Sequence, residues 1–294
     1  MKTVRFLSFL SASSFFSVAS LFLFLGAVSQ ADEPNVPQTV KTNDGRELKL
    51  VWNDEFNGEG LPDPSKWSYE IGYVRNNEAQ YYTDARLENV CQKDGNLVIT
   101  TLKEKYSLEG KKNTKGRAEA EYTSGAIETL GKASWLYGRV EVRAKLPKGK
   151  GIWPAIWMMG DNIGKVGYPK CGEIDVMEYV GHTPKRSHAT IHMQNKDNLR
   201  GVVSKGKNLF FENLEEEFHV FALEWTEEQL TILVDEQVAL EFKRAEEAPK
   251  TPEWPFDKPC YIILNTALGG SWGGAIAEDT CPAEFLIDYV RVYQ

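Results

Sequence analysis

Residues 171–181 read CGEIDVMEYVG, a stretch in which three carboxylic acids are interleaved with apolar side chains. Alternate side chains of a β-strand share one face, so Glu173 and Asp175 are predicted to point one way and their apolar neighbours the other way. Glu178 lies five residues after Glu173, an odd offset that regular alternation would turn into the apolar layer. Because burying a lone carboxylate is costly, we expect a one-residue β-bulge near residues 176–177 that returns Glu178 to the acidic face.

Three acids on one face of a strand indicate acid–base chemistry. The carboxylates repel one another and raise one another's pKa, so at least one tends to hold a proton near neutral pH. Glycoside hydrolysis needs this combination of one ionised and one protonated carboxyl group. The backbone span from Glu173 to Glu178 is roughly 13 Å, which long side chains on a concave strand could narrow to the separation of a retaining pair. A solvated acidic strand and an oxygen-ligated calcium site are the alternatives.

The chain around this stretch predicts an all-β protein. It is a series of short runs, several of which alternate polar and apolar residues, separated by turn residues. No long segment has a clear helical period, and there is no solenoid-scale repeat. We therefore expect a single β-sandwich of two large curved antiparallel sheets. The runs include residues 95–103, 122–130, 137–146, 188–193, 218–225, 230–242, 261–268 and 285–293.

The composition limits the partners and the redox chemistry. The chain has 294 residues and a formal net charge of −8, which disfavours a nucleic-acid partner. No nucleotide or redox cofactor motif is present, so we expect no cofactor for catalysis, and we expect a monomer. The four cysteines, Cys91, Cys171, Cys260 and Cys281, allow three full pairings, of which Cys260 with Cys281 encloses a short loop. Buried free thiols are the alternative.

The N-terminus predicts an exported protein. Lys2 and Arg5 precede an apolar, serine-punctuated stretch at residues 6–28, and small residues follow before an acidic segment. This pattern is typical of a secretory signal, so residues 1–31 are expected to be a signal peptide that is removed. A membrane anchor is the alternative, because the apolar stretch is nearly long enough to span a bilayer.

The remaining chain is expected to form one folded domain. Residues 32–46 are mostly polar and contain proline, which predicts a linker or N-terminal extension, and the folded domain is then residues 47–294. Nothing after residue 31 resembles a second membrane span, so we expect a secreted or periplasmic protein without a membrane partner once the signal is removed.

Tryptophans lie just before the acidic strand. The segment GIWPAIWMMG at residues 151–160 contains Trp153 and Trp157, and the chain has eight tryptophans. Aromatic faces stack on the apolar faces of sugar rings, so these two side chains are candidates for substrate binding. Ordinary packing in the core is the alternative.

The segment GEIDVMEYVG resembles the signature of glycoside hydrolase family 16, and the methionine before its last glutamate marks the β-bulge branch of that family. Further segments resemble laminarinase-type members, in the expected order, over residues 49–294. The resemblance implies that residues 47–294 are a family 16 catalytic domain, a jelly-roll sandwich with an open cleft on its concave face. It also implies a retaining endo-β-1,3-glucanase that binds β-glucan. The segments include VWNDEFNG, NNEAQYYT, YTSGAIETLGK, YGRVEVRAKLPKGKGIWPAIWMMG, FHVFALEWT and WPFDKPCYIILNTALGGSWGG.

The resemblance assigns a role to each acid. Glu173 is implied as the nucleophile, Glu178 as the general acid and base, and Asp175 as the electrostatic helper between them. These roles agree with the reading of the acidic strand on its own.

The resemblance also implies a set of substrate-binding residues. For Arg139, Glu141 and Arg143 the alternative is a cross-strand salt bridge. For His192 the alternative is a structural role. His188 and His219 are expected to be structural, and Ala79 departs from the leucine usual in its motif. The implied set is Asn77, Arg139, Glu141, Arg143, Trp153, Trp157, His192, Asn265 and Trp272.

A structural calcium is a further implication of the family pattern. Glu55, Gly95 and Asp288 match the positions of its usual ligands, and oxygen ligands suit calcium.

Rival functions remain open at this point. A non-catalytic β-glucan-binding module uses the same fold, although the intact acids argue against it. The same mechanism also serves mixed-linkage glucan, agar, carrageenan, porphyran and xyloglucan, and transglycosylation passes through the same intermediate.

Overall fold

The computed structural model describes residues 36–294, and the predicted signal peptide at residues 1–31 lies outside them. The first strand, β1 (Thr39–Lys41), pairs antiparallel with β2 (Glu47–Asp54) across a turn that contains Asp44 and Gly45. Residues 39–46 are therefore part of a β-hairpin, and they lie within the segment that the sequence predicted to be a linker. No helix among residues 36–294 is long and apolar enough to cross a membrane.

In the described residues the strands form two sheets, as expected, and nearly all neighbouring strands run antiparallel. The first is an 11-stranded sheet with a main path of eight strands, to which β1, β2 and β5 are attached. Within this sheet the short pair β4–β7 is parallel. Its main path is β16 (Gln237–Lys243), β15 (Gln229–Val234), β14 (His219–Trp225), β9 (Gly138–Lys145), β18 (Ala283–Tyr293), β6 (Asn96–Ser107), β7 (Glu119–Ser124) and β4 (Tyr81–Tyr82), with β5 (Val90–Lys93) paired to β6.

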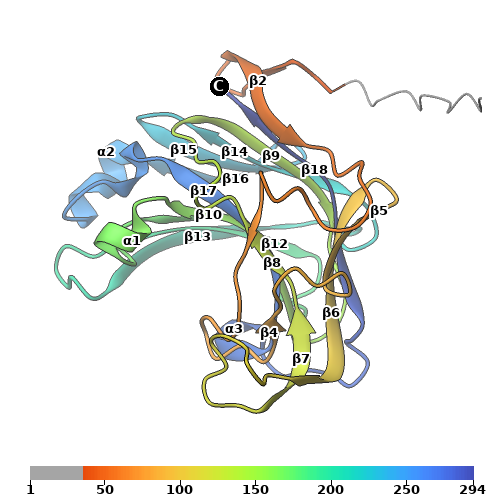
Figure 1. Ribbon diagram of the computed structural model, residues 1–294. Helices are drawn as coiled ribbons and strands as arrows, with labels where there is room; N and C mark the ends of the chain where they lie inside the picture. The colour runs from red at the N-terminus through yellow and green to blue at the C-terminus, as the bar shows by residue number, and fades with distance from the viewer. Residues whose placement is uncertain (1–35) are drawn as a thin grey trace, which may run out of the picture. The chain divides into compact units, whose positions relative to one another are not determined.

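The second sheet has seven strands, and the acidic strand lies in its interior next to the central strand. In Figure 1, β9, β14 and β18 of the first sheet run above β10, β12 and β13 of the second. The order of the seven strands is β13 (Val202–Phe210), β12 (Arg186–Gln194), β11 (Glu173–Glu178), β10 (Ile152–Gly160), β17 (Cys260–Leu268), β8 (Ala126–Glu128) and β3 (Ser68–Tyr69).

The core lies between the two sheets because each contributes one apolar face. Val140 and Val142 of β9 and Ile174 and Val176 of β11 are at most 5% exposed and belong to one buried cluster. The alternating polar residues of both strands therefore face outward. Burial of this shared face explains why β9 keeps a period of two, and why β11 keeps it as far as Val176.

Helices are short in residues 36–294 and lie in connections. They are α1 (Ile163–Val166), α2 (Arg244–Glu247), α3 (Gly270–Gly273), η1 (Ala248–Lys250) and η2 (Pro255–Asp257). All four cysteines fall in the described residues, and all four are free thiols. The pairing of Cys260 with Cys281 is therefore not formed, and the alternative of free thiols holds, with Cys171 and Cys260 buried.

Candidate active site

Strand β11 contains the predicted bulge. Its neighbour β10 pairs Trp157 with Asp175 and the preceding Ile156 with Met177, so Val176 is the extra residue. The pairing with β12 shifts in the same place, between Asp175 and Glu178. Val176 and Met177 both bury their side chains in the core. The bulge thus accommodates two successive apolar residues and returns Glu178 to the face that carries the other acids.

The two strands that pair with β11 each supply a side chain that contacts an acid. His192 on β12 places Nε2 3.2 Å from Oδ2 of Asp175, and its Nδ1 lies 2.6 Å from Oγ of Ser204 on β13. The indole N–H of Trp153 on β10 donates to Oε1 of Glu178 at 3.0 Å. A positioned imidazole and a positioned indole therefore flank the acids on opposite sides of β11.

Burial favours the protonated form of two of the three acids. It raises the pKa of Glu178 well above its usual value, and the charge of Asp175 adds to the effect. The pKa of Asp175 is also raised, by burial first and then by the charge of Glu173. The site can therefore keep one carboxyl protonated beside an ionised neighbour, the combination that glycoside hydrolysis requires.

All three acids line one open cavity on the outer face of the seven-stranded sheet. This cavity has a volume of about 340 Å³. A smaller cavity of about 40 Å³ adjoins it and shares the acids and Trp153. The larger cavity is lined by Asn76, Trp153, Tyr168, Glu173, Asp175, Glu178, Thr190, His192 and Trp272.

Two of the predicted tryptophans are placed to form a wall of this cavity. The rings of Trp153 and Trp272 meet edge to face with centroids 5.4 Å apart. Trp272 lies on α3, next to the glycine-rich turn, and is partly exposed. The ring of His188 also meets the ring of Trp272 edge to face, with centroids 5.0 Å apart, so His188 lies beside the site. His188 was expected to be structural, since a lone histidine on a strand most often is, and its position beside the site was not predicted.

Trp157 and Asn265 are more buried than expected for substrate-binding residues. Trp157 is 4% exposed, and its indole N–H donates to Oδ1 of Asn265 at 2.8 Å. The amide of Asn265 in turn donates to the hydroxyl of Tyr82 at 2.8 Å. This chain of hydrogen bonds supports the floor of the smaller cavity, which both residues line.

The asparagine that reaches the cavity is Asn76 rather than the predicted Asn77. Asn76 and Asn77 are both exposed, but Asn76 lines both cavities and donates to Oε1 of Glu78 at 3.2 Å, whereas Asn77 lines neither cavity. Both residues have positive φ angles, so the backbone turns sharply here. A sequence pattern with two adjacent asparagines cannot tell which one the turn points inward.

Tyr168 and Arg75 are two cavity residues that sequence reasoning missed. Tyr168 precedes the acidic strand by five residues and lines the larger cavity together with Glu173. Burial and the charge of Glu173 both raise the pKa of this tyrosine. Arg75 lies before the two asparagines and lines the smaller cavity. Neither residue type is diagnostic on a loop, so only the fold reveals their positions.

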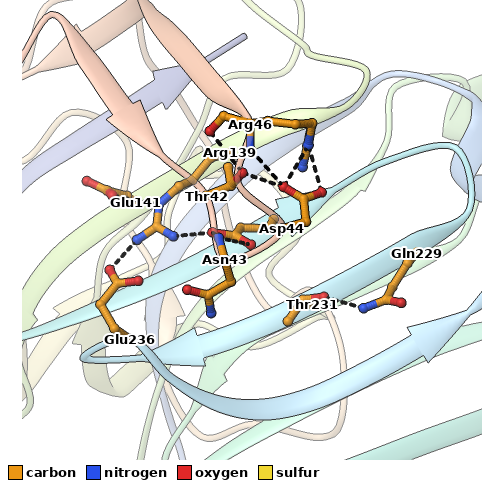
Figure 2. A network of polar contacts seen from close by, with 10 residues as sticks. Thr42, Asn43, Asp44, Arg46, Arg139, Glu141, Gln229, Thr231 and Glu236 are labelled. Carbon is orange, nitrogen blue, oxygen red and sulfur yellow. Dashed lines mark hydrogen bonds and ion pairs between the residues drawn. The ribbon is translucent and has the colours of Figure 1, made fainter.

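The predicted substrate residues on β9 lie on the wrong sheet. Arg139, Glu141 and Arg143 alternate with core valines on the 11-stranded sheet, so they face away from the core on the side opposite the acidic strand. Figure 2 shows the guanidinium of Arg139 in a network with the surrounding glutamates. It is 1% exposed and bonds Glu141 at 2.7 Å, Glu224 at 2.5 Å and Glu236.

These three residues therefore serve packing and charge pairing. Arg143 forms an ion pair with Asp288, again on the outer face of the first sheet. A salt bridge, the alternative that the sequence allowed, is the arrangement observed. The period of two placed all three side chains on one face correctly but could not say to which sheet the strand belongs.

The predicted calcium ligands are engaged with arginines. Glu55 receives two hydrogen bonds from Arg291, at 2.9 and 2.7 Å, and Asp288 is paired with Arg143. Each carboxylate therefore already has a cationic partner. This arrangement does not fit a calcium site, in which both carboxylates would have to bind the same ion. The calcium site, including Gly95, remains a prediction and takes no part in the chemistry below.

Acidic and histidine side chains converge in one place among residues 36–294. Oxygen and nitrogen atoms of Glu173, Asp175 and His192 lie within 4.8 Å of one another. Within this group Nε2 of His192 lies 3.2 Å from Oδ2 of Asp175.

Comparison with known proteins supports the same chemistry. The model of the family described as Glycosyl hydrolases family 16 matches residues 77–291. A beta-glucanase of Rhodothermus marinus is 43% identical over 257 residues, covering 84% of this chain and 85% of that protein. A glucan endo-1,3-beta-glucosidase of Cryptopygus antarcticus is 38% identical over 254 residues, covering 82% of this chain and 90% of that protein.

A solved structure shares the fold. It is a mutant of a non-specific endo-beta-1,3(4)-glucanase from the same family, co-crystallized with 1,3-beta-D-cellotriosyl-glucose. It is 41% identical to this chain, superimposes with a TM-score of 0.76, and the alignment covers 88% of this chain and 98% of that one.

Proposed function

The chain belongs to glycosyl hydrolase family 16, and from that premise we propose that it is a retaining endo-glucanase that hydrolyses laminarin-like β-1,3-glucan. The names of the beta-glucanase and the glucan endo-1,3-beta-glucosidase among its relatives support the substrate. The observation that carries the mechanism is the bulged strand β11, which presents Glu173, Asp175 and Glu178 to one open cavity.

In the first step Glu173 is the nucleophile and Glu178 is the acid. The carboxylate of Glu173 attacks the anomeric carbon while Glu178 gives its proton to the glycosidic oxygen, and the bond between that carbon and oxygen breaks. The reducing-end fragment leaves, and the other fragment stays as an ester on Glu173. Burial supports this assignment, because it favours the protonated form of Glu178 before the reaction.

In the second step Glu178 becomes the base. It removes a proton from a water molecule, whose oxygen attacks the anomeric carbon and displaces Glu173. Two inversions restore the original β-configuration. Asp175 lies between the two glutamates and contacts His192. It can therefore take up a proton, or share one with Glu173, when the charge of Glu173 changes during the reaction.

The aromatic wall of the cavity is the proposed sugar platform. Trp272 is partly exposed beside Trp153, whose N–H is already committed to Glu178. An aromatic face in a concave site offers apolar contact to a sugar ring, and the acids nearby accept hydrogen bonds from its hydroxyls.

A comparison of wild type with Glu173→Gln tests the assignment. New reducing ends are measured on laminarin, lichenan, agarose and xyloglucan. We expect strong release from laminarin by the wild type and a loss of several orders of magnitude in the variant, which is nearly isosteric but lacks the nucleophile. Release mainly from another polymer would correct the substrate, and no release by the wild type from any of them would sink the enzymatic proposal.

Mixed-linkage glucan is the second candidate substrate. The solved structure that shares this fold belongs to an enzyme described as non-specific for β-1,3(4) linkages. If the present cleft has the same tolerance, lichenan is hydrolysed at a rate comparable to laminarin, and Glu173→Gln abolishes both activities. A wild type active on laminarin alone would exclude this candidate.

Export and a monomeric state complete the proposal. Residues 1–31 have the charged, apolar and small-residue order of a secretory signal, and four free cysteines do not preclude an oxidising compartment. The mature N-terminus of protein expressed with its full chain, read by mass spectrometry, should begin near residue 32. Size-exclusion chromatography with light scattering tests the monomer.

A further inference from the structure

Trp157 does not offer its ring to a sugar, because an arginine already covers it. The guanidinium carbon of Arg75 lies 4.8 Å from the centroid of the Trp157 ring, and the indole N–H is used by Asn265. Trp157 is consequently 4% exposed, although β10 places it directly beside Asp175. The group that the cleft presents at this position, one strand away from the acids, is the side chain of Arg75.

The guanidinium of Arg75 has donors left over. Among residues 36–294, Glu70 is the one acceptor recorded for it. A guanidinium carries five N–H donors in a planar fork, so most of them have no protein partner. The side chain is 25% exposed and lines the smaller cavity together with the three acids. The guanidinium therefore borders the space that the proposed function gives to the substrate.

The surroundings of Arg75 are acidic. Glu70 and Glu78 are close enough for their charges to act on the guanidinium, and the pKa of Glu128 is raised to about 7 by burial first and then by the charge of Glu70. An incoming sulfate or carboxylate would meet these groups as well as the catalytic acids, and Arg75 already has an anionic partner. A neutral hydroxyl group is not repelled by these charges. It can accept a hydrogen bond from Arg75 and donate one to a carboxylate.

We propose that Arg75 is a specificity-determining residue that hydrogen-bonds the hydroxyls of a neutral sugar unit next to the one attacked, and that its acidic surroundings select against sulfated or uronic chains. This inference rests on the proposed function, because it names the substrate class of the same cleft.

Three variants separate this role from a structural one. Arg75→Ala removes the fork, and Arg75→Lys keeps the charge and the pairing with Glu70 but lacks the planar donors. Arg117→Ala is the matched control, since the guanidinium of Arg117 stacks on Tyr73 at 4.3 Å and lines neither cavity of the acids. Thermal unfolding of each variant checks that it folds; if Arg75→Ala does not, Arg75→Lys carries the test.

The kinetic readout uses laminari-oligosaccharides and carrageenan, a sulfated galactan. For Arg75→Ala on the oligosaccharides we expect KM to rise about tenfold or more with kcat changed less than about threefold, because a contact formed equally in the ground state and the transition state is lost. Arg75→Lys should fall between the wild type and the alanine variant. Arg117→Ala should match the wild type, and carrageenan should not be cleaved by any of them.

Several outcomes would overturn the proposal. An unchanged KM in Arg75→Ala would do so, and so would wild-type cleavage of carrageenan that Arg75→Ala abolishes, because Arg75 would then be an anion site. Retardation on a laminarin affinity gel keeps the test independent of activity. A wild type that is retarded but releases no reducing ends would defeat the proposed function alone, and weaker retardation of Arg75→Ala would still support the role of Arg75.

Discussion

Trp153 tunes the acid as well as lining the cleft. Its indole N–H donates to Oε1 of Glu178, and this bond lowers a pKa that burial and Asp175 raise. A hydrogen bond to a carboxylate stabilises its ionised form, so the indole limits how strongly Glu178 holds its proton. In the proposed mechanism this side chain therefore sets part of the pH range in which Glu178 acts as the acid.

The variant Trp153→Phe should shift that range upward. It keeps an aromatic ring but removes the donor, so the pKa of Glu178 rises and the protonated acid persists to higher pH. In a profile of kcat/KM against pH, the descending alkaline limb moves to higher pH. Trp272→Phe, which alters the neighbouring indole without a bond to Glu178, should leave the limb in place. A limb that moves to lower pH in Trp153→Phe would contradict this account.

The raised pKa of Glu178 should also lower the free energy of unfolding at neutral and alkaline pH. Its folded pKa is raised above the unfolded value, so the folded state binds more protons between the two, and the free energy of unfolding falls as pH rises through that window. Glu178→Gln removes the titrating group. The variant is expected to be inactive but more stable than wild type at pH 8, with the difference shrinking toward pH 4. Thermal unfolding at both pH values measures this, and equal gaps at the two values would show that the titration of Glu178 does not affect stability.

Strand β11 is the element whose conformation followed from its sequence. An odd offset between Glu173 and Glu178 forces either a buried carboxylate or an extra residue, and the structure has the extra residue at Val176. Counting residues along the strand was enough to predict the bulge, because burying a lone carboxylate instead would cost several kcal/mol of folding free energy. The same count on β9 correctly predicted that Arg139, Glu141 and Arg143 share one face, but the prediction placed the strand in the wrong sheet. The alternation of polar and apolar residues is the same whether the strand pairs with the acidic strand or lies in the opposite sheet.

The hairpin β1–β2 was misjudged because three residues carry little periodicity. Its attachment depends on a long-range contact, in which the backbone N–H of Asn43 donates to both carboxylate oxygens of Glu224 at 3.0 and 3.1 Å. No local pattern in residues 32–46 can report a partner so distant along the chain. The hairpin adds polar pairing above the charged network of Arg139, as Figure 2 shows for Asn43.

Two truncations measure what this hairpin contributes. A chain that begins at residue 47 loses β1 and the hydrogen bonds to Glu224, and it should lose about 1.5–3 kcal/mol of unfolding free energy, as expected for a bond to a charged acceptor. A chain that begins at residue 38 keeps both and should match the full protein. Urea denaturation gives the two values. Equal stability of the two truncations would support the original prediction of a linker.

The whole molecule divides its charges between two outer faces. The seven-stranded sheet carries the acids and the open cavity, whereas the 11-stranded sheet buries Arg139 among three glutamates on its outer side. The sequence predicted the sandwich, the family and the shared face of the three acids, because these depend on alternation and on one contiguous motif. It could not predict Arg75, Asn76 or Tyr168 as lining residues, because loops distant in sequence meet only once the sheets are formed.

The division predicts that stability and catalysis can be altered separately. Arg139→Met should lower the free energy of unfolding by about 3–5 kcal/mol, because it leaves buried carboxylates without their partner. Arg143→Met, whose ion pair is 40% exposed, should cost at most about 1 kcal/mol. Both variants should retain the kcat and KM of the wild type at temperatures where they are folded. A changed KM in folded Arg139→Met would return this residue to the substrate-binding set.

The stereochemistry of the first product tests the central claim most directly. Proton NMR during the first minutes of hydrolysis of a laminari-oligosaccharide shows which anomer of the new reducing end appears before mutarotation mixes the two. If Glu173 forms a covalent intermediate and Glu178 then activates water, the β-anomer appears first and the α-anomer grows in later. Initial release of the α-anomer would mean a single inversion, and the assignment of Glu173 as nucleophile would be wrong.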